Sequence, residues 1–346
     1  MTAPIRIKML VNGGLDFWQR QLPNGNPIYR GCKFLFDLNE RHYDWLVVYD
    51  DLASQSTERR SLRMEPLNCP KANTLLITSE PANIKSYGRA FTHQFGWILT
   101  SQPEWALPHP GRIYSQPALY WFYGSNHKIS YDQMAQNPLL KKPKILSTVC
   151  SNKQQKHTVH NQRYEFTHAL KKQLPELEIF GRGIRPVEDK SEALDDYKYH
   201  IAIENFIGKH HWTEKLADAF LGGCLPFYYG CPNAADYFPP ESFIPIDINN
   251  LAEAAQTIRQ AIENNEYEKR LPHILEARRR VMEEYNIFSV LAREIPKRNN
   301  TEIPQKKNLL LSRRALRKRP TILIADLWDK AKLRILNSRN EQITKH

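Results

Sequence analysis

The residue types best suited to chemistry lie between two apolar runs, at residues 199–203 and 225–229. The first run predicts a buried strand, and Glu204 and Asn205 follow it directly. A polar loop that contains His211 comes next. Because open α/β sheets bind ligands at the carboxyl ends of their strands, these side chains indicate a site for a polar or charged ligand.

A predicted helix begins after this loop with Thr213, Glu214 and Lys215. Thr213 can cap the helix, and the carboxylate of Glu214 suits its positive end. The cation of Lys215 is electrostatically misplaced in the same turn. An anion bound at the helix N-terminus, such as a nucleotide diphosphate, would explain it, since free backbone N–H groups also point there. A surface ion pair is the alternative.

Two more strand ends carry polar side chains. Arg182 stands in a Gly-Arg-Gly turn after the apolar residues 177–180, where it could offer a fork of donors to a phosphate or simply be an exposed turn residue. Glu80 follows the strand expected at residues 74–78, and Pro81 then forces a turn. A partly buried Glu80 with a raised pKa could act as a general base; a loop carboxylate paired with a cation is the alternative.

Apolar runs alternate with segments of helical spacing in both halves of the chain. We expect strands at residues 5–11, 45–49, 74–78, 97–100, 145–150, 177–180, 199–203, 225–229 and 242–248. Helical spacing appears at residues 160–172, 251–264 and 266–285. This alternation predicts two doubly wound α/β domains that face one another across a cleft. The expected boundaries are 1–140 and 141–295, joined by a linker at residues 136–143, with a tail at 296–346.

The composition is that of a globular protein, with 41% hydrophobic and 25% charged residues. The net charge is +12, but the tail carries 14 Lys and Arg against 4 Asp and Glu, so the rest of the chain is close to neutral. A nucleic-acid-binding core is therefore not indicated.

The five cysteines have no metal-ligand spacing and are expected to be free thiols. Asp50 and Asp51 at a strand end are better explained by turn chemistry than by a metal site. No apolar run could span a membrane or serve as a signal peptide, so we expect a cytoplasmic location.

The stretch YKYHIAIENFIGKHHWTEKLADAFLGGCLPFYYGCP resembles the signature of the α-1,3-fucosyltransferases, glycosyltransferase family 10. Its Glu-Asn pair, its Thr-Glu-Lys triplet, Pro226 and Gly230 stand at matching places. Weaker similarity extends over residues 75–247 and includes TSEP at residues 78–81. The sequence departs from the family at Ile203, where an aromatic is usual, and at His211 and Trp212.

The resemblance implies a GT-B fold with two Rossmann-like domains, an acceptor site mostly in the first and a GDP-fucose site mostly in the second. It also implies an inverting transfer that needs neither a metal nor a cofactor. By resemblance, Glu80 would deprotonate the acceptor hydroxyl, and Lys215 and Arg182 would neutralise the departing diphosphate. Glu214 and Asn205 would bind hydroxyls of the sugar or ribose. The remaining donor-binding residues expected are Glu204, His211 and Thr213.

Bacterial members of the family act on lipid-linked or lipopolysaccharide glycans, so the acceptor is expected to be an oligosaccharide or lipid-linked glycan, modified at the 3-hydroxyl of GlcNAc or Glc. The basic tail contains Leu323, Leu327, Ile335 and Leu336, a pattern that predicts an amphipathic helix for peripheral contact with the inner face of the cytoplasmic membrane. A disordered tail is the alternative. Three other functions stay open: a transferase for another nucleotide sugar, a non-catalytic glycan- or nucleotide-binding protein, and a membrane-binding scaffold that acts through the tail.

Overall fold

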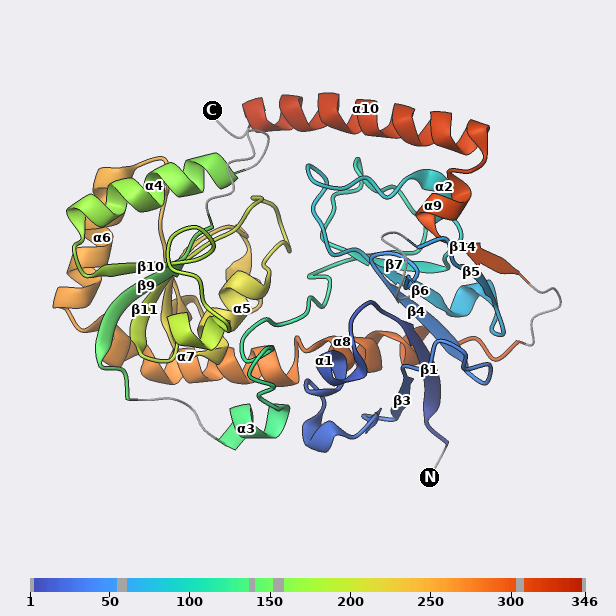
Figure 1. Ribbon diagram of the computed structural model, residues 1–346, viewed down its shortest axis with the longest axis horizontal. Coiled ribbons are helices and arrows are strands. Elements are labelled where there is room, and N and C mark those ends of the chain that lie inside the picture. Colours follow the sequence, from blue (N-terminus) through green and yellow to red (C-terminus); the bar gives the residue numbers. More distant parts are fainter. Residues whose placement is uncertain (1–2, 55–60, 137–140, 152–158, 303–307, 344–346) are drawn as a thin grey trace. The chain divides into compact units, whose positions relative to one another are not determined.

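The chain forms two compact units, seen here in a computed structural model that describes residues 3–54, 61–136, 141–151, 159–302 and 308–343 (Figure 1). The first unit contains Met1–Gln19, Asn26–Ala118 and Phe288–His346. The second contains Arg20–Gly25 and Leu119–Ile287. Both units have a parallel sheet at their centre.

These boundaries differ from the expected 1–140, 141–295 and 296–346. The residues after Leu119 belong to the second unit because the carboxylate of Asp218 accepts hydrogen bonds from the backbone N–H groups of Phe122 (3.1 Å) and Tyr123 (3.0 Å). Of the expected linker, residues 137–140 lie outside the described part of the chain. The C-terminal segment is no separate tail, because it supplies a strand and two helices to the first unit.

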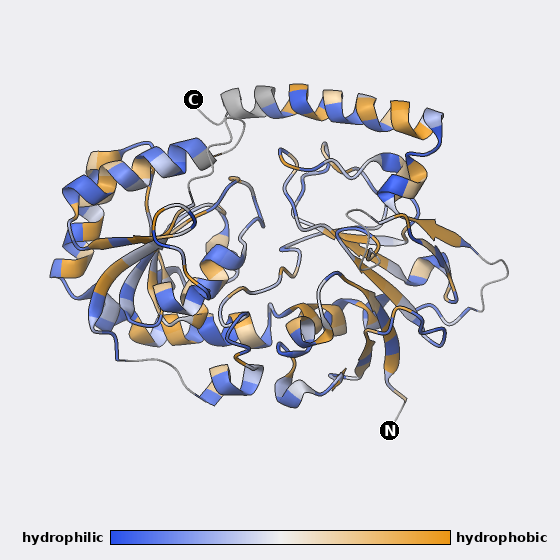
Figure 2. Ribbon diagram, in the orientation of Figure 1, coloured by the Kyte–Doolittle hydropathy of each residue, from blue (hydrophilic) through white to orange (hydrophobic). Residues whose placement is uncertain are grey.

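The sheet of the first unit has the strand order β2-β3-β1-β4-β6-β7-β8, and all neighbours are parallel except β2 and β3. Its hydrophobic strands stand out in Figure 2. Because the order reverses beside β1, the carboxyl ends of β1 and β4 form a topological switch point. The strands are β1 (Ile5–Leu10), β2 (Ile28–Tyr29), β3 (Cys32–Leu35), β4 (Trp45–Tyr49), β6 (Thr74–Ile77), β7 (Trp97–Thr100) and β8 (Arg112–Tyr114).

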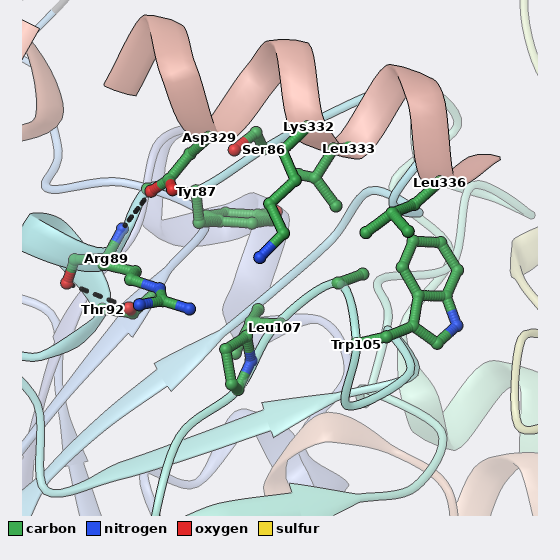
Figure 3. A pocket seen from close by; sticks show the side chains of 13 residues that line it. Ser86, Tyr87, Arg89, Thr92, Trp105, Leu107, Asp329, Lys332, Leu333 and Leu336 are labelled. Carbon is green, nitrogen blue, oxygen red and sulfur yellow. Dashed lines mark hydrogen bonds between the residues drawn. The ribbon is translucent and has the colours of Figure 1, made fainter. Parts of the chain in front are cut away.

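The C-terminal segment packs on this unit. Its strand β14 (Leu309–Leu311) pairs antiparallel with β5 (Met64–Pro66), and α9 (Arg313–Leu316) and α10 (Pro320–Ile343) follow. Gly88 lets α10 approach, since a Cβ there would lie 2.2 Å from an Asp326 carboxylate oxygen. Figure 3 shows Leu333 and Leu336 of α10 beside a small pocket that Trp105 and Leu107 also line. The other helices of this unit are α1 (Leu15–Gln19), α2 (Arg89–Thr92) and α8 (Ile287–Glu294).

The sheet of the second unit is fully parallel, with the order β10-β9-β11-β12-β13. Its order reverses beside β9, so the carboxyl ends of β9 and β11 form a second switch point. The strands are β9 (Lys144–Val149), β10 (Leu177–Phe180), β11 (Tyr197–Ile203), β12 (Leu225–Tyr229) and β13 (Ile244–Pro245). The helices are α3 (Tyr131–Gln136), α4 (His160–Gln173), α5 (Glu214–Leu221), α6 (Leu251–Glu263) and α7 (Glu266–Glu283), with a 3-10 turn η3 (Lys190–Ala193).

Both faces of this sheet are covered. Tyr199, Ile201 and Ile203 of β11 contribute to a core that includes residues of α4 and α6 on one face, whereas Ala202 packs with residues of α5 and α7 on the other (Figure 1). Strands buried on both faces explain the nearly continuous apolar runs in the sequence. The expected doubly wound α/β class is therefore confirmed, and two such units are the components of a GT-B fold.

Candidate functional site

A cavity of about 230 Å³ lies in the second unit at the switch point between β9 and β11. Ser151, two residues beyond β9, and Asn205, two residues beyond β11, line it. Charged side chains from α4, η3 and α5 complete the lining: Arg163, Lys190, Glu214, Lys215 and Asp218. Carboxyl ends of strands at a switch point are the usual ligand site of such sheets.

Glu204 is 0% exposed and does not line this cavity, but it contacts Lys215, which does. Its carboxylate accepts hydrogen bonds from the Thr213 N–H (2.8 Å) and hydroxyl (2.6 Å), and its Oε2 lies 3.5 Å from Lys215 Nζ. Gly230 makes this arrangement possible, because a Cβ there would lie 2.4 Å from Glu204 Cγ. Glu204 and Thr213 were expected to bind the donor; neither lines the cavity, and both are joined by hydrogen bonds at the first turn of α5.

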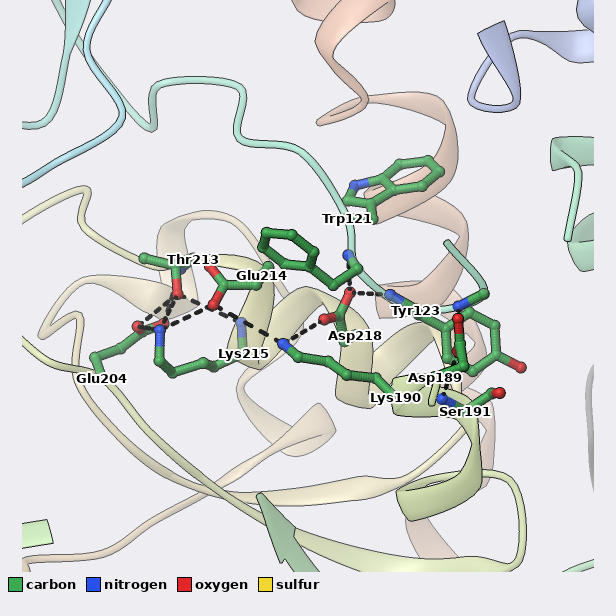
Figure 4. Close-up of polar contacts among 12 residues, drawn as sticks. Trp121, Tyr123, Asp189, Lys190, Ser191, Glu204, Thr213, Glu214, Lys215 and Asp218 are labelled. Atoms are coloured by element: carbon green, nitrogen blue, oxygen red, sulfur yellow. Dashed lines mark hydrogen bonds and ion pairs between the residues drawn. The ribbon is translucent and has the colours of Figure 1, made fainter. Parts of the chain in front are cut away.

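Side chains of alternating charge that line the cavity contact one another in a row (Figure 4). Lys215 Nζ lies 3.0 Å from Glu214 Oε1, and Lys190 Nζ lies 3.8 Å from the same oxygen and 2.7 Å from Asp218 Oδ2. Burial would raise the pKa of Glu214, but Lys215 and Lys190 outweigh it and lower that pKa to about 2. Burial would likewise lower the pKa of Lys215, but Glu214 and Glu204 raise it. Both groups are therefore charged at neutral pH.

Arg163, in the first turn of α4, is only 7% exposed. One guanidinium nitrogen donates to Asn205 Oδ1 at 3.0 Å, while the buried Nε has no hydrogen-bond partner in the described part of the chain. A buried donor without an acceptor is costly, and such a donor on a cavity wall calls for an acceptor from a ligand. An anionic ligand oxygen would satisfy it.

The structure does not bring His211 and Arg182 to the cavity wall. His211 is 3% exposed, and its ring contacts that of Phe206 edge-on at 5.4 Å. Burial, followed by the charge of Lys215, lowers the pKa of His211 to about 3, so the imidazole is neutral. Trp212 packs in the aromatic core with Phe238. Arg182 is exposed in the turn after β10, where Gly181 has a φ of +133°.

Glu80 belongs to the first unit and follows β6 by three residues. It is partly buried, and its backbone N–H donates to the Tyr87 hydroxyl at 3.3 Å. The side-chain amide of Gln102 donates to the backbone carbonyls of Glu80 (2.8 Å) and Lys85 (3.1 Å). These bonds tie together the two ends of a short loop at the carboxyl edge of the first sheet.

Sequence reasoning missed Arg163, Lys190 and Asp218. The argument that singled out Lys215, a cation in the first turn of a helix, applies equally to Arg163 and could have found it. Lys190 and Asp218 carry no such signal, because their role depends on contacts with distant residues.

Within the described ranges, no group of three or more His, Cys, Asp or Glu side chains could hold a metal ion. No described helix is long and apolar enough to cross a membrane.

The segment of this chain that matches a known protein family includes every residue that lines this cavity. Residues 139–271 match the family model of the glycosyltransferase family 10 (fucosyltransferase) C-terminal domain. The alpha-(1,3)-fucosyltransferase FucT of Helicobacter pylori is 38% identical over 74 residues, 21% of this chain and 16% of that protein. The 4-galactosyl-N-acetylglucosaminide 3-alpha-L-fucosyltransferase 9 of Homo sapiens is 32% identical over 130 residues, 36% of this chain and 35% of that protein.

A crystal structure of an alpha1,3-fucosyltransferase with GDP-fucose is 18% identical in sequence to this chain. The match covers 78% of this chain and 81% of that one, with a TM-score of 0.44. The two curated relatives are matched over only 16% and 35% of their own length.

Proposed function

We propose that the chain transfers L-fucose from GDP-fucose to a hydroxyl of a glycan, because its residues 139–271 match the glycosyltransferase family 10 model. The curated fucosyltransferases that match parts of this chain support the transfer of fucose. The acceptor that we propose is the 3-hydroxyl of a GlcNAc or Glc unit in a surface glycan such as lipopolysaccharide.

One observation carries the donor assignment. The buried Nε of Arg163 has no acceptor within the described structure, and it belongs to a side chain that lines a cavity with Lys215 and Lys190. Three cations around one cavity at the carboxyl end of a sheet suit a diphosphate. The carboxylates of Glu214 and Asp218 hold the two lysines in place, which limits the reorganisation that binding requires.

The mechanism follows from the charges that develop. The carboxylate of Glu80 takes the proton of the acceptor hydroxyl, whose oxygen forms the new bond to the anomeric carbon of fucose. The bond from that carbon to the diphosphate breaks on the opposite side, so the configuration inverts. Arg163 and Lys215 neutralise the negative charge that GDP carries away, a task that otherwise needs a metal ion. Asn205 and Glu214 offer hydrogen bonds to the ribose or sugar hydroxyls.

Turnover of a panel of nucleotide sugars tests the donor assignment directly. The protein should release GDP from GDP-fucose in the presence of a GlcNAc-containing acceptor and leave UDP-sugars intact. Arg163→Gln should weaken GDP binding by about 10-fold or more, because a charged hydrogen bond contributes about 1.5–3 kcal/mol. Arg259, whose guanidinium donates to the Gln173 carbonyl on the protein surface, provides the matched control variant Arg259→Gln.

Other outcomes of the same panel favour the two alternatives. Activity with a different donor and none with GDP-fucose would indicate a related transferase on the same fold. GDP binding without transfer to any acceptor would indicate a non-catalytic nucleotide-binding protein. Glu80 separates an enzyme from a binder, because Glu80→Gln removes the proposed base and leaves the donor cavity in the other unit untouched.

We also propose that α10 contacts a membrane surface. It presents large exposed side chains, among them Ile324 (68% exposed), Leu327 (57%), Trp328 (73%) and Ile335 (56%). They stand at positions i, i+3, i+4 and i+11 of the helix, which share one face, and lie among basic residues, as in helices that rest on anionic membranes. Figure 2 shows these hydrophobic segments along the helix. Leu336, expected on the same apolar face, instead lines the pocket between α10 and the rest of the first unit.

Substitution tests this contact better than truncation, because β14 and α9 are part of the first unit and a deletion would remove them. Co-sedimentation with vesicles that contain anionic lipid should fall several-fold in an Ile324→Ser, Trp328→Ser variant. Leu333→Ser is unsuitable as a control because Leu333 is 8% exposed and packs inward. Equal sedimentation of variant and wild type would refute the contact.

A further inference from the structure

A second and larger cavity, of about 840 Å³, lies in the first unit at its own switch point. Asn12 follows β1 and Asp50 follows β4, and both line the cavity. The strand order β3-β1-β4 makes the carboxyl ends of β1 and β4 the position where such sheets bind ligands. None of the site residues expected from the sequence lines this cavity.

The C-terminal segment forms one wall of the cavity. Pairing of β14 with β5 brings Ser312 to the start of α9, where its hydroxyl caps the helix and donates to the Ser61 carbonyl at 2.8 Å. The next residue, Arg313, donates its backbone N–H to Asp51 Oδ1 at 3.2 Å and its guanidinium to the Ser86 carbonyl. These contacts fix α9 beside the carboxyl edge of the sheet.

Cations outnumber carboxylates around this cavity. Its charged lining residues are Lys85, Arg313, Arg314, Arg317 and Lys330, against Asp50 and Asp51. Asp50 forms an ion pair with Lys85 and also accepts hydrogen bonds from the hydroxyls of Tyr87 (2.6 Å) and Ser79 (2.8 Å).

The remaining cations are poorly compensated. Arg317 forms an ion pair with Asp326 at 2.7 Å, but Arg314 and Lys330 form none within the described residues. The buried Nε of Arg313 has no acceptor in the same part of the chain. Burial lowers the pKa of Lys330, and the charges of Arg317 and Arg313 lower it further. Like charges held this close repel one another, and a bound anion would relieve that repulsion.

We propose that this cavity binds an anionic group, a phosphate or a carboxylate, of the acceptor glycan. The proposal rests on the proposed function, since it takes the first unit as the acceptor-binding unit. The loop that begins at Glu80 supplies Ile84, Lys85 and Ser86 to the cavity lining. The Gln102 amide ties the two ends of this loop together. An anion bound at Lys85 would therefore hold the acceptor against the loop that carries the proposed base.

Titration with inorganic pyrophosphate tests the site, using the full chain saturated with GDP so that the donor cavity is filled. Wild type should bind pyrophosphate, and an Arg314→Gln, Lys330→Gln variant should bind it about 10-fold or more weakly, since each change removes a charged partner. Lys330→Arg keeps the charge and should keep most of the affinity. Lys318→Gln is the matched control, because Lys318 is exposed on the same segment and does not line the cavity.

Acceptor kinetics provide a second test of the site. Pyrophosphate should raise the KM for an acceptor that carries phosphate or glucuronate, and should leave the KM for its neutral counterpart unchanged. Comparing the phosphate-bearing and glucuronate-bearing acceptors identifies the preferred anion. In the double variant the KM for the charged acceptor should rise to that for the neutral acceptor, so the preference for charge is lost. The kcat on the neutral acceptor should be retained.

The proposal is overturned if GDP-saturated protein does not bind pyrophosphate, or if the double variant binds it as well as Lys318→Gln does. It is also overturned if anionic vesicles occupy these cations while pyrophosphate does not compete. Failure of the proposed function looks different: no acceptor, charged or neutral, would then be fucosylated, while pyrophosphate binding and its dependence on Arg314 and Lys330 would persist and show an anion site of another purpose.

Discussion

Replacing Lys215 with methionine should have two separable effects. The first is on stability, because Glu204 is 0% exposed and Lys215 Nζ, 3.5 Å from its Oε2, is its only cationic partner in the described structure. Removing one partner of a buried ion pair leaves an uncompensated charge, which costs about 3–5 kcal/mol of unfolding free energy. Burial already raises the pKa of Glu204, and the variant should raise it further.

The second effect is on the ligand. Loss of a charged hydrogen bond to the diphosphate should weaken GDP binding by about 1.5–3 kcal/mol, or about 10- to 150-fold. Guanosine, which lacks the diphosphate, should bind wild type and Lys215→Met equally well. Isothermal titration with the two ligands measures the difference, and chemical denaturation measures the stability.

A second substitution separates the two effects. In a Glu204→Gln, Lys215→Met variant the amide oxygen still accepts a hydrogen bond from Thr213, and no buried charge remains. Most of the lost stability should return, but the GDP affinity should stay low. Lys198, which forms a surface ion pair with Glu268, supplies the control Lys198→Met. If the double variant regained wild-type GDP affinity, Lys215 would act only through the fold and the diphosphate assignment would be wrong.

Three further predictions concern the base, the glycine and the acidic partner of this site. Glu80→Gln should lower kcat by about 10²- to 10⁴-fold with GDP affinity unchanged, and near-full transfer would remove its role as base. Gly230→Ala should cost about 1–3 kcal/mol in denaturation, because the new Cβ would lie 2.4 Å from a side-chain carbon, whereas Gly14→Ala meets nothing within 4 Å and should be neutral. The pKa of Glu214 is lowered from 4.5 to about 2, so its contribution of about 3 kcal/mol is complete above pH 4.5 and is lost as the pH falls toward 2. A Glu214→Gln variant with the same acid unfolding profile as wild type would contradict that contribution.

Local sequence patterns were sufficient to predict most of the secondary structure. The apolar runs at residues 45–49, 97–100 and 225–229 form β4, β7 and β12 with those bounds. Runs buried on both faces of a parallel sheet are uniformly apolar, which makes them readable in the sequence. The run at 242–248 yields only Ile244–Pro245 as a strand, with one further hydrogen bond from the Ile246 N–H to the Tyr228 carbonyl.

The helix start at Thr213 was equally readable, because a capping side chain and its partner are neighbours in the chain. Thr213 does accept a hydrogen bond from the Lys215 backbone N–H. Asn205, Glu214 and Lys215, singled out in the sequence, line one cavity, because strand ends and helix starts meet at one edge of a doubly wound sheet.

Tertiary structure alone decided what each of these groups does. Glu204 is 0% exposed and contacts Lys215, and its N–H bonds to the Tyr229 carbonyl of the neighbouring strand; no local pattern reports that depth. Arg163 reaches Asn205 across 42 residues of sequence, and Lys190 reaches Asp218 across 28. The C-terminal residues looked like a detached basic tail, yet β14 pairs with a strand more than 240 residues earlier and delivers Arg313 to the first sheet. Burial and long-range pairing depend on the whole chain, and a sequence read a few residues at a time does not contain them.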